Sequence, residues 1–122
     1  MNIQMESLVE EVKGLLEKKD YMAARSLIAE GMKRDPDAPE PHNLLGILLE
    51  MQEEHGQAMK HFRAAWALDP TYLPARMNIG QYADFSLTEH EPIYSAQEEP
   101  HHSYHVVFNE NGFGEMVKEK RR

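Results

Sequence analysis

The 122-residue sequence has no cysteine, no long apolar run and no amino-terminal targeting pattern. Without cysteine the chain can form neither disulfide bonds nor thiolate metal sites. This composition suits a reducing compartment, so we expect the protein to be cytoplasmic. No apolar stretch approaches the ~18–20 residues that a membrane-spanning helix needs. The first six residues have neither the basic nor the apolar region of a signal peptide, so we expect none.

Basic residues are scarce relative to acidic ones. The 13 Lys and Arg against 21 Asp and Glu give a formal net charge of −8. Binding of nucleic acid requires a basic stripe that displaces counterions, and the only basic cluster is residues 118–122, which we interpret as a solvated tail. We therefore expect no nucleic-acid partner and no binding to anionic membranes.

A spacing of 34 residues relates successive parts of the region 5–86. Similar residues recur at this spacing: Asp35-Pro36 and Asp69-Pro70, Ala24 and Ala58, Ile28 and Phe62, and Leu15 and Leu49. Because a single shift aligns all of these pairs, the chain repeats one structural unit.

The second unit, residues 39–72, carries a recognisable pattern. It reads His42-x2-Leu45-Gly46-x2-Leu49, followed by Ala58-x3-Phe62, Ala65 and Pro70. This resembles the tetratricopeptide repeat, whose pattern is Trp-x2-Leu-Gly-x2-Tyr, Ala-x3-Phe and a closing Pro, and it departs from that pattern at His42 and Leu49. The resemblance covers about two and a half repeats. It implies an all-α fold, a right-handed superhelix of antiparallel helix pairs.

Helical periodicity predicts five helices, at about 4–18, 21–34, 39–53, 56–68 and 73–86. We expect tight turns at Lys19-Asp20 and at His55-Gly56. Gly46 lacks a side chain and so allows the next helix to approach closely. The Asp-Pro pairs end the second helix of each unit, because a residue before proline avoids the helical conformation.

The repeat breaks after residue 86. Continuing the register would place Pro92 inside a helix, where it would cost ~3 kcal/mol. We therefore divide the chain into a helical repeat domain, 1–86, and a tail, 87–122. The tail is expected to be irregular or to form a short β-hairpin around Asn111-Gly112. The last helix has too many apolar residues for one contact face. We expect the tail either to be disordered or to dock on the domain or on a dimer mate.

The main candidate site is the concave groove that the resemblance implies, lined by the first helix of each pair. By helical phase its residues are Val9, Lys13, Leu16, Asn43, Ile47, Glu50, Met51, Met77, Gln81 and Phe85. This mixture of apolar and acidic groups would complement an amphipathic helix or an extended peptide. We expect a non-enzymatic adaptor or scaffold that binds another polypeptide. The alternative is a homodimeric structural module that pairs through the terminal helix and the tail.

The tail also contains a histidine cluster, His101, His102 and His105. On a helix, His101 and His105 would share a face and could hold a divalent metal, but Pro100 and the β-forming residues after it oppose a helix. A metal-binding protein is therefore the remote alternative. The sequence contains no nucleophile motif, phosphate-binding loop or zinc-protease motif, so we expect neither enzymatic activity nor a cofactor.

Overall fold

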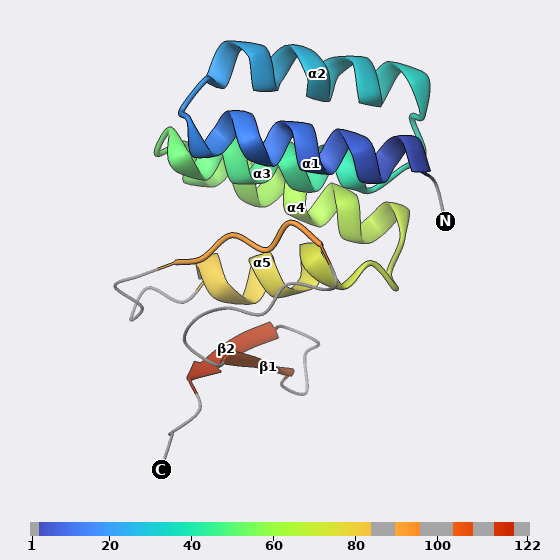
Figure 1. Ribbon diagram of the computed structural model, residues 1–122. Helices are drawn as coiled ribbons and strands as arrows, with labels where there is room; N and C mark the ends of the chain where they lie inside the picture. The colour runs from blue at the N-terminus through green and yellow to red at the C-terminus, as the bar shows by residue number, and fades with distance from the viewer. Residues whose placement is uncertain (1–2, 84–89, 96–103, 109–113, 119–122) are drawn as a thin grey trace.

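The computed structural model describes residues 3–83, 90–95, 104–108 and 114–118 (Figure 1). Its helices are α1 (Ile3–Glu17), α2 (Tyr21–Arg34), α3 (Glu40–Met51), α4 (His55–Leu68) and α5 (Leu73–Ala83). All five predicted helices are therefore confirmed, and each begins within one residue of its predicted start. The predicted end of the last helix, at 86, lies outside the described residues. No strand occurs between residues 3 and 83.

Two short strands lie near the C-terminus. β1 (Tyr104–Phe108) pairs antiparallel with β2 (Gly114–Lys118), with Tyr104 opposite Lys118.

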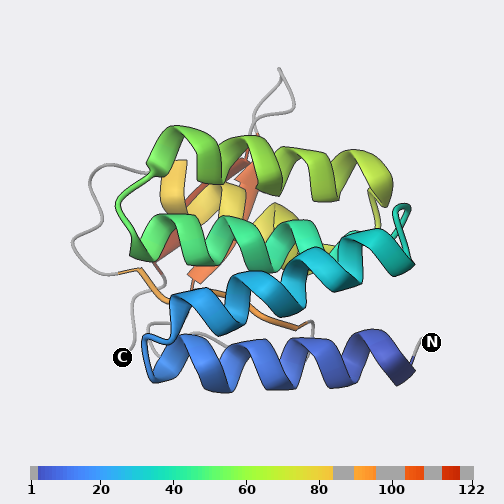
Figure 2. The same ribbon diagram turned by 90° about the horizontal axis from the view of Figure 1, so that it is seen from above.

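Each helix packs against the next one along the chain, and α1 also contacts α3 (Figures 1 and 2). Viewed from above, α1 to α4 lie side by side, and α5 lies beneath them in the view of Figure 1. Within the described residues, no helix is long and apolar enough to cross a membrane.

The turns within the two helix pairs have the same geometry at the 34-residue spacing. Lys19 and Glu53 both adopt the left-handed conformation, with φ of 60° and 62°. In the first turn the Asp20 N–H donates to the Leu15 carbonyl at 2.9 Å, and the equivalent bond from residue 54 to residue 49 measures 2.8 Å. A left-handed residue followed by this bond is a common way of ending a helix. The turns therefore repeat in backbone geometry as well as in sequence.

The turn predicted at His55-Gly56 is wrong. The chain turns at residues 52–54, and both His55 and Gly56 belong to the first turn of α4. Glu53, and not a glycine, adopts the left-handed conformation in this turn. The absence of a side chain at Gly56 serves no packing purpose, because a Cβ there would meet nothing within 4 Å.

The core depends on close contact between the helices of a pair. A Cβ on Gly46 would lie 2.5 Å from Cε1 of Phe62, a fully buried ring on α4. The close approach predicted for Gly46 is therefore present. A Cβ on Gly31 would similarly lie 2.6 Å from Leu8. The apolar core runs through α1 to α4, and among the described residues its one fully buried member from outside the helices is Tyr94.

Candidate functional site

Residues 90–95 lie along the helices and form the centre of the candidate site (Figure 1, orange). They belong to no helix or strand, yet Ile93 is only 1% exposed and Tyr94 only 5%. The segment passes between α5 on one side and α1 and α3 on the other, in the views of Figures 1 and 2. The helical repeat thus holds a piece of its own chain.

Two asparagines bind the main chain of Ile93. The Ile93 N–H donates to Asn78 Oδ1 at 2.9 Å, and Asn78 Nδ2 donates to the Ile93 carbonyl at 2.9 Å. Asn43 Nδ2 donates to the same carbonyl at 3.0 Å, and Asn78 Nδ2 also donates to Asn43 Oδ1 at 2.9 Å. Both asparagine side chains are fully buried. Asn43 on α3 and Asn78 on α5 therefore form one network with the segment.

Gln81 binds the main chain two residues earlier. Its Nε2 donates to the Glu91 carbonyl, and its Oε1 accepts from the Glu91 N–H. In an extended chain, the N–H and C=O groups of alternate residues point to the same side. The bonding of residues 91 and 93 follows this alternation, and Pro92 between them has no N–H to satisfy. The helices therefore hold the segment through groups that every residue except proline carries.

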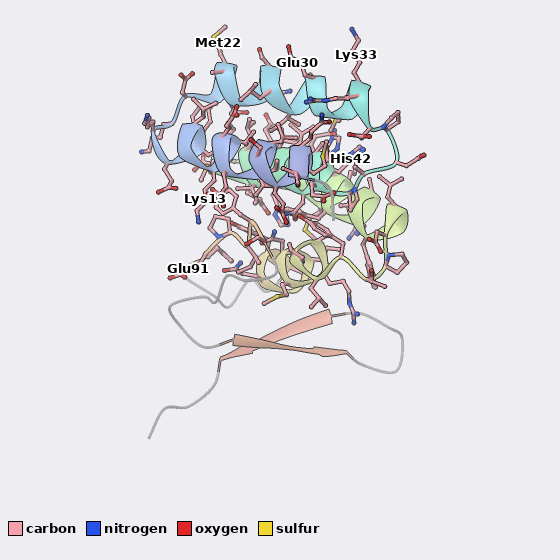
Figure 3. All side chains as sticks on the ribbon, turned by 45° about the vertical axis from the view of Figure 1, so that its right-hand side comes forward. Lys13, Met22, Glu30, Lys33, His42 and Glu91 are labelled. Carbon is pink, nitrogen blue, oxygen red and sulfur yellow. The ribbon has the colours of Figure 1, made fainter. Side chains whose placement is uncertain are left out.

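Aromatic contacts fix both ends of the segment. His90 stacks on Tyr82, with ring centroids 4.9 Å apart, and Tyr82 stacks in turn on Phe62 at 5.7 Å. Burial raises the pKa of Tyr82 well above its usual range. At the other end, the Lys13 ammonium lies 5.4 Å from the centroid of the Tyr94 ring, within the range of a cation–π contact. In Figure 3, Lys13 extends from α1 toward the side on which Glu91 lies.

The predicted groove residues divide into three groups. Lys13, Asn43 and Gln81 contact residues 90–95 directly. Three apolar residues belong instead to the buried core: Val9, Leu16 and Ile47. The remaining described ones are Glu50, which bonds His55, Met51, which is 36% exposed, and Met77, which is partly buried. Phe85 lies outside the described residues.

Sequence reasoning missed Asn78, which makes two hydrogen bonds to the main chain of Ile93. A strict 34-residue register aligns Asn43 with Met77, so helical phase selected Met77 for the groove. The structure places Asn78, one residue further, beside Asn43. The available signal was an amide between the apolar residues Met77 and Ile79, because a buried polar side chain requires a partner.

Glu50 lies at the edge of the site with a side chain that is only 9% exposed. Burial raises its pKa, and the hydrogen bond from His55, with Nδ1 2.9 Å from Oε2, opposes that shift. An ionised Glu50 therefore depends on His55 as its partner.

A pair of histidines bridges α3 and α4 away from the segment. The Nδ1 atoms of His42 and His61 are 3.1 Å apart, and the rings stack with centroids 5.4 Å apart. Burial lowers the pKa of both residues. The contact suits two neutral rings, one donating to the other, and it disfavours two charged ones.

No group of three or more His, Asp, Glu or Cys residues that could hold a metal occurs in the described part of the chain. Of the weak metal candidates, His101 and His102 lie outside the described residues. His105 lies on β1, where only the backbone is described. The histidine-rich metal site therefore stays a prediction from sequence.

Comparisons with protein-family models, curated proteins and solved structures found no match for this chain. The site is therefore interpreted from its own contacts.

Proposed function

We propose that the chain is a non-enzymatic, cytoplasmic interaction module of the tetratricopeptide type, which binds another polypeptide along α1, α3 and α5. The observation that carries this proposal is the way the helices hold residues 90–95. Asn43, Asn78 and Gln81 bind the N–H and C=O groups of the segment, which are common to all polypeptides. A surface with these donors and acceptors is suited to a peptide main chain.

The tetratricopeptide assignment is supported by the recurrence of local features at 34 residues. Besides the turns at Lys19 and Glu53, the helix ends repeat. The Asp35 N–H donates to the Gly31 carbonyl at 3.0 Å, and the Asp69 N–H donates to the Ala65 carbonyl at 3.1 Å. Repeated helix pairs of this kind stack into a curved solenoid with a concave binding surface. We therefore propose a right-handed superhelix as the arrangement of the pairs.

Between the two ligand shapes that the sequence left open, an extended peptide is the better fit. A helix bonds its own N–H and C=O groups internally, so it would leave the amides of Asn78 and Gln81 without partners. An extended chain presents these groups to its neighbour, as in strand addition to a sheet edge. The proposed ligand is therefore an extended segment.

A peptide library displayed on phage and selected against the full chain tests this function. Peptides that bind in the groove should lose affinity at least about tenfold on the Asn78→Asp variant, because two donated hydrogen bonds are lost. The control is Gln57→Glu, the same chemical change at an exposed position of α4. Selected peptides that bind the Asn78→Asp variant as tightly as the wild type would show that the groove is not the binding surface.

The homodimeric alternative has less support. β1 and β2 lie against α5 within the same chain, so the terminal helix has a cover without a second copy (Figure 1). Light scattering of the full chain separates the two functions. A monomer at high concentration eliminates the dimer, and a stable dimer favours it.

A further inference from the structure

The segment 90–95 differs from the rest of the fold in how it is held. Every other apolar residue in the main core cluster lies on a helix between α1 and α4, and Tyr94 is the segment's only contribution to that cluster. In the described part of the chain, its main chain is bonded by the side chains of Asn43, Asn78 and Gln81. Removing the segment would therefore leave the backbone hydrogen bonds of the helices intact.

The chemistry of the contact is that of an exchangeable ligand. A permanently buried contact costs least when apolar groups fill it, because burying an amide requires complete hydrogen bonding. Asn43, Asn78 and Gln81 are at most 1% exposed with the segment in place. Without it, water would hydrate them. Amides at this position therefore suit a surface that exists both occupied and open.

We propose that residues 90–95 are a self-ligand that occupies the groove in cis, and that the partner is an extended peptide of the same pattern. This inference rests on the proposed peptide-binding function and specifies the ligand. The partner displaces the segment when it binds. The pattern has an aliphatic residue followed by an aromatic one, in the places of Ile93 and Tyr94.

The hydrogen bonds add a rule about proline. The N–H groups at the positions of Glu91 and Ile93 are both donors to helix side chains, so proline is excluded from these two positions. The position of Pro92 lies between them and accepts proline. Lys13 favours an aromatic residue at the position of Tyr94 through its contact with the ring face. At the first position, an aromatic ring or histidine would stack on Tyr82.

Occupation in cis lowers the apparent affinity for a partner. A segment joined by the six residues 84–89 acts at an effective concentration of the order of mM. The apparent dissociation constant for a trans peptide rises by the inverse of the fraction of open groove. Releasing the segment should therefore strengthen peptide binding by about tenfold or more.

The test uses a fluorescein-labelled peptide with the sequence of residues 88–97 and measures its anisotropy on titration with the full-length protein. The groove is opened by Ile93→Asp, which places a charge where the segment is 1% exposed. We expect the peptide to bind this variant at least about tenfold more tightly than the wild type. Adding Asn78→Asp to the variant should abolish binding.

Altered peptides test the proline rule on the opened protein. A peptide with Pro92→Ala should bind within a few fold of the parent, and one with Ile93→Pro should not bind. Equal binding of both peptides would overturn the main-chain recognition that defines the ligand.

Folding is monitored by the helical circular dichroism signal. A second opened variant, Ile93→Pro, removes the N–H without burying a charge. If both variants lose their helical signal, the segment is an integral part of the fold and the proposal fails. It also fails if either variant stays helical and does not bind the peptide, or if wild type and variant bind it equally.

Light scattering adds one further outcome. A wild-type dimer that becomes monomeric in the opened variants would identify a second copy as the occupant and would also overturn the proposal.

Failure of the self-peptide alone does not remove the proposed function. Library peptides that bind the wild type and depend on Asn78 would show that the groove binds peptides of another pattern. Loss of both kinds of binding would remove the function as well.

Discussion

Asn78→Asp is the most informative single substitution in this chain, because it changes one donor and keeps the shape of the side chain. Asn78 Nδ2 donates to the Ile93 carbonyl and to Asn43 Oδ1, both at 2.9 Å. In the aspartate an oxygen replaces this nitrogen and faces the two acceptors. The bond that Oδ1 accepts from the Ile93 N–H at 2.9 Å can remain. Only the donating half of the contact is lost.

The size of the effect follows from these contacts. Two lost hydrogen bonds cost about 0.5–1.5 kcal/mol each, and Asn43 Oδ1, a buried acceptor left without its donor, costs about 1–3 kcal/mol more, whereas the Ile93 carbonyl keeps the bond from Asn43 Nδ2. A docked segment would therefore be destabilised by about 3 kcal/mol or more. The segment can leave the groove, after which water hydrates the carboxylate. We therefore expect undocking of residues 90–95, with α1 to α4 still folded.

Amide hydrogen exchange measured by NMR reports this undocking directly. In the wild type, the Glu91 and Ile93 amides should be protected, because both donate to buried side chains. A loss of about 3 kcal/mol corresponds to exchange more than about 100-fold faster in the variant. Protection within α1 to α4 should change little. Gln57→Glu, at an exposed position, should leave both sites protected.

Two results would refute this reasoning. If the Ile93 amide remains as protected in Asn78→Asp as in the wild type, the asparagine network does not hold the segment. If protection in α1 to α4 collapses together with that of Ile93, the segment and the helices form one cooperative unit.

Three further predictions concern stability. Gly46→Ala should lower the free energy of unfolding by about 1–3 kcal/mol in urea denaturation, because the added Cβ would lie 2.5 Å from a buried ring. Gly14→Ala, where a Cβ meets nothing within 4 Å, should raise it by up to about 1 kcal/mol; the same sign for both variants would contradict the packing argument. Burial lowers the pKa of both His42 and His61, so between these values and 6.5 the unfolded chain binds more protons than the folded one. The melting temperature should therefore fall as the pH drops below about 6.5, and replacing both residues by glutamine should flatten this dependence. Glu50 has a raised pKa and contributes the opposite slope above 4.5, so the difference in slope between the wild type and the double variant isolates the histidines; an unchanged slope in the double variant would refute their role.

The helices were predictable because their signals are local and repeated. Asp69-Pro70 ends α4, and the 34-residue register relates the start of α2 to the start of α4. The second turn was not predictable from residue type, because Glu53 adopts a conformation that glycine adopts more readily. That turn is fixed by the backbone bonds at the end of α3, which the sequence pattern does not reveal.

The site was only partly predictable. Helical phase found Lys13, Asn43 and Gln81, since these lie on the expected face of their helices. It missed Asn78, which lies one step outside the repeat register. Docking of the tail on the domain was one of the alternatives that the sequence left open, but nothing singled out residues 90–95, because Pro92 was interpreted only as a residue that ends the helical repeat. In the structure, Pro92 is the residue of the segment whose missing N–H costs nothing, since the bonded residues lie on either side of it.

The Ile93 carbonyl accepts hydrogen bonds from both Asn43 on α3 and Asn78 on α5. One oxygen atom of the bound segment thus bridges two helices that are not neighbours along the chain. When the groove is empty, this bridge is missing, and α5 keeps its packing on α4 and the direct bond from Asn78 to Asn43. Filling the groove is therefore expected to hold α5 more rigidly. The point at which the following chain begins is then held more rigidly as well.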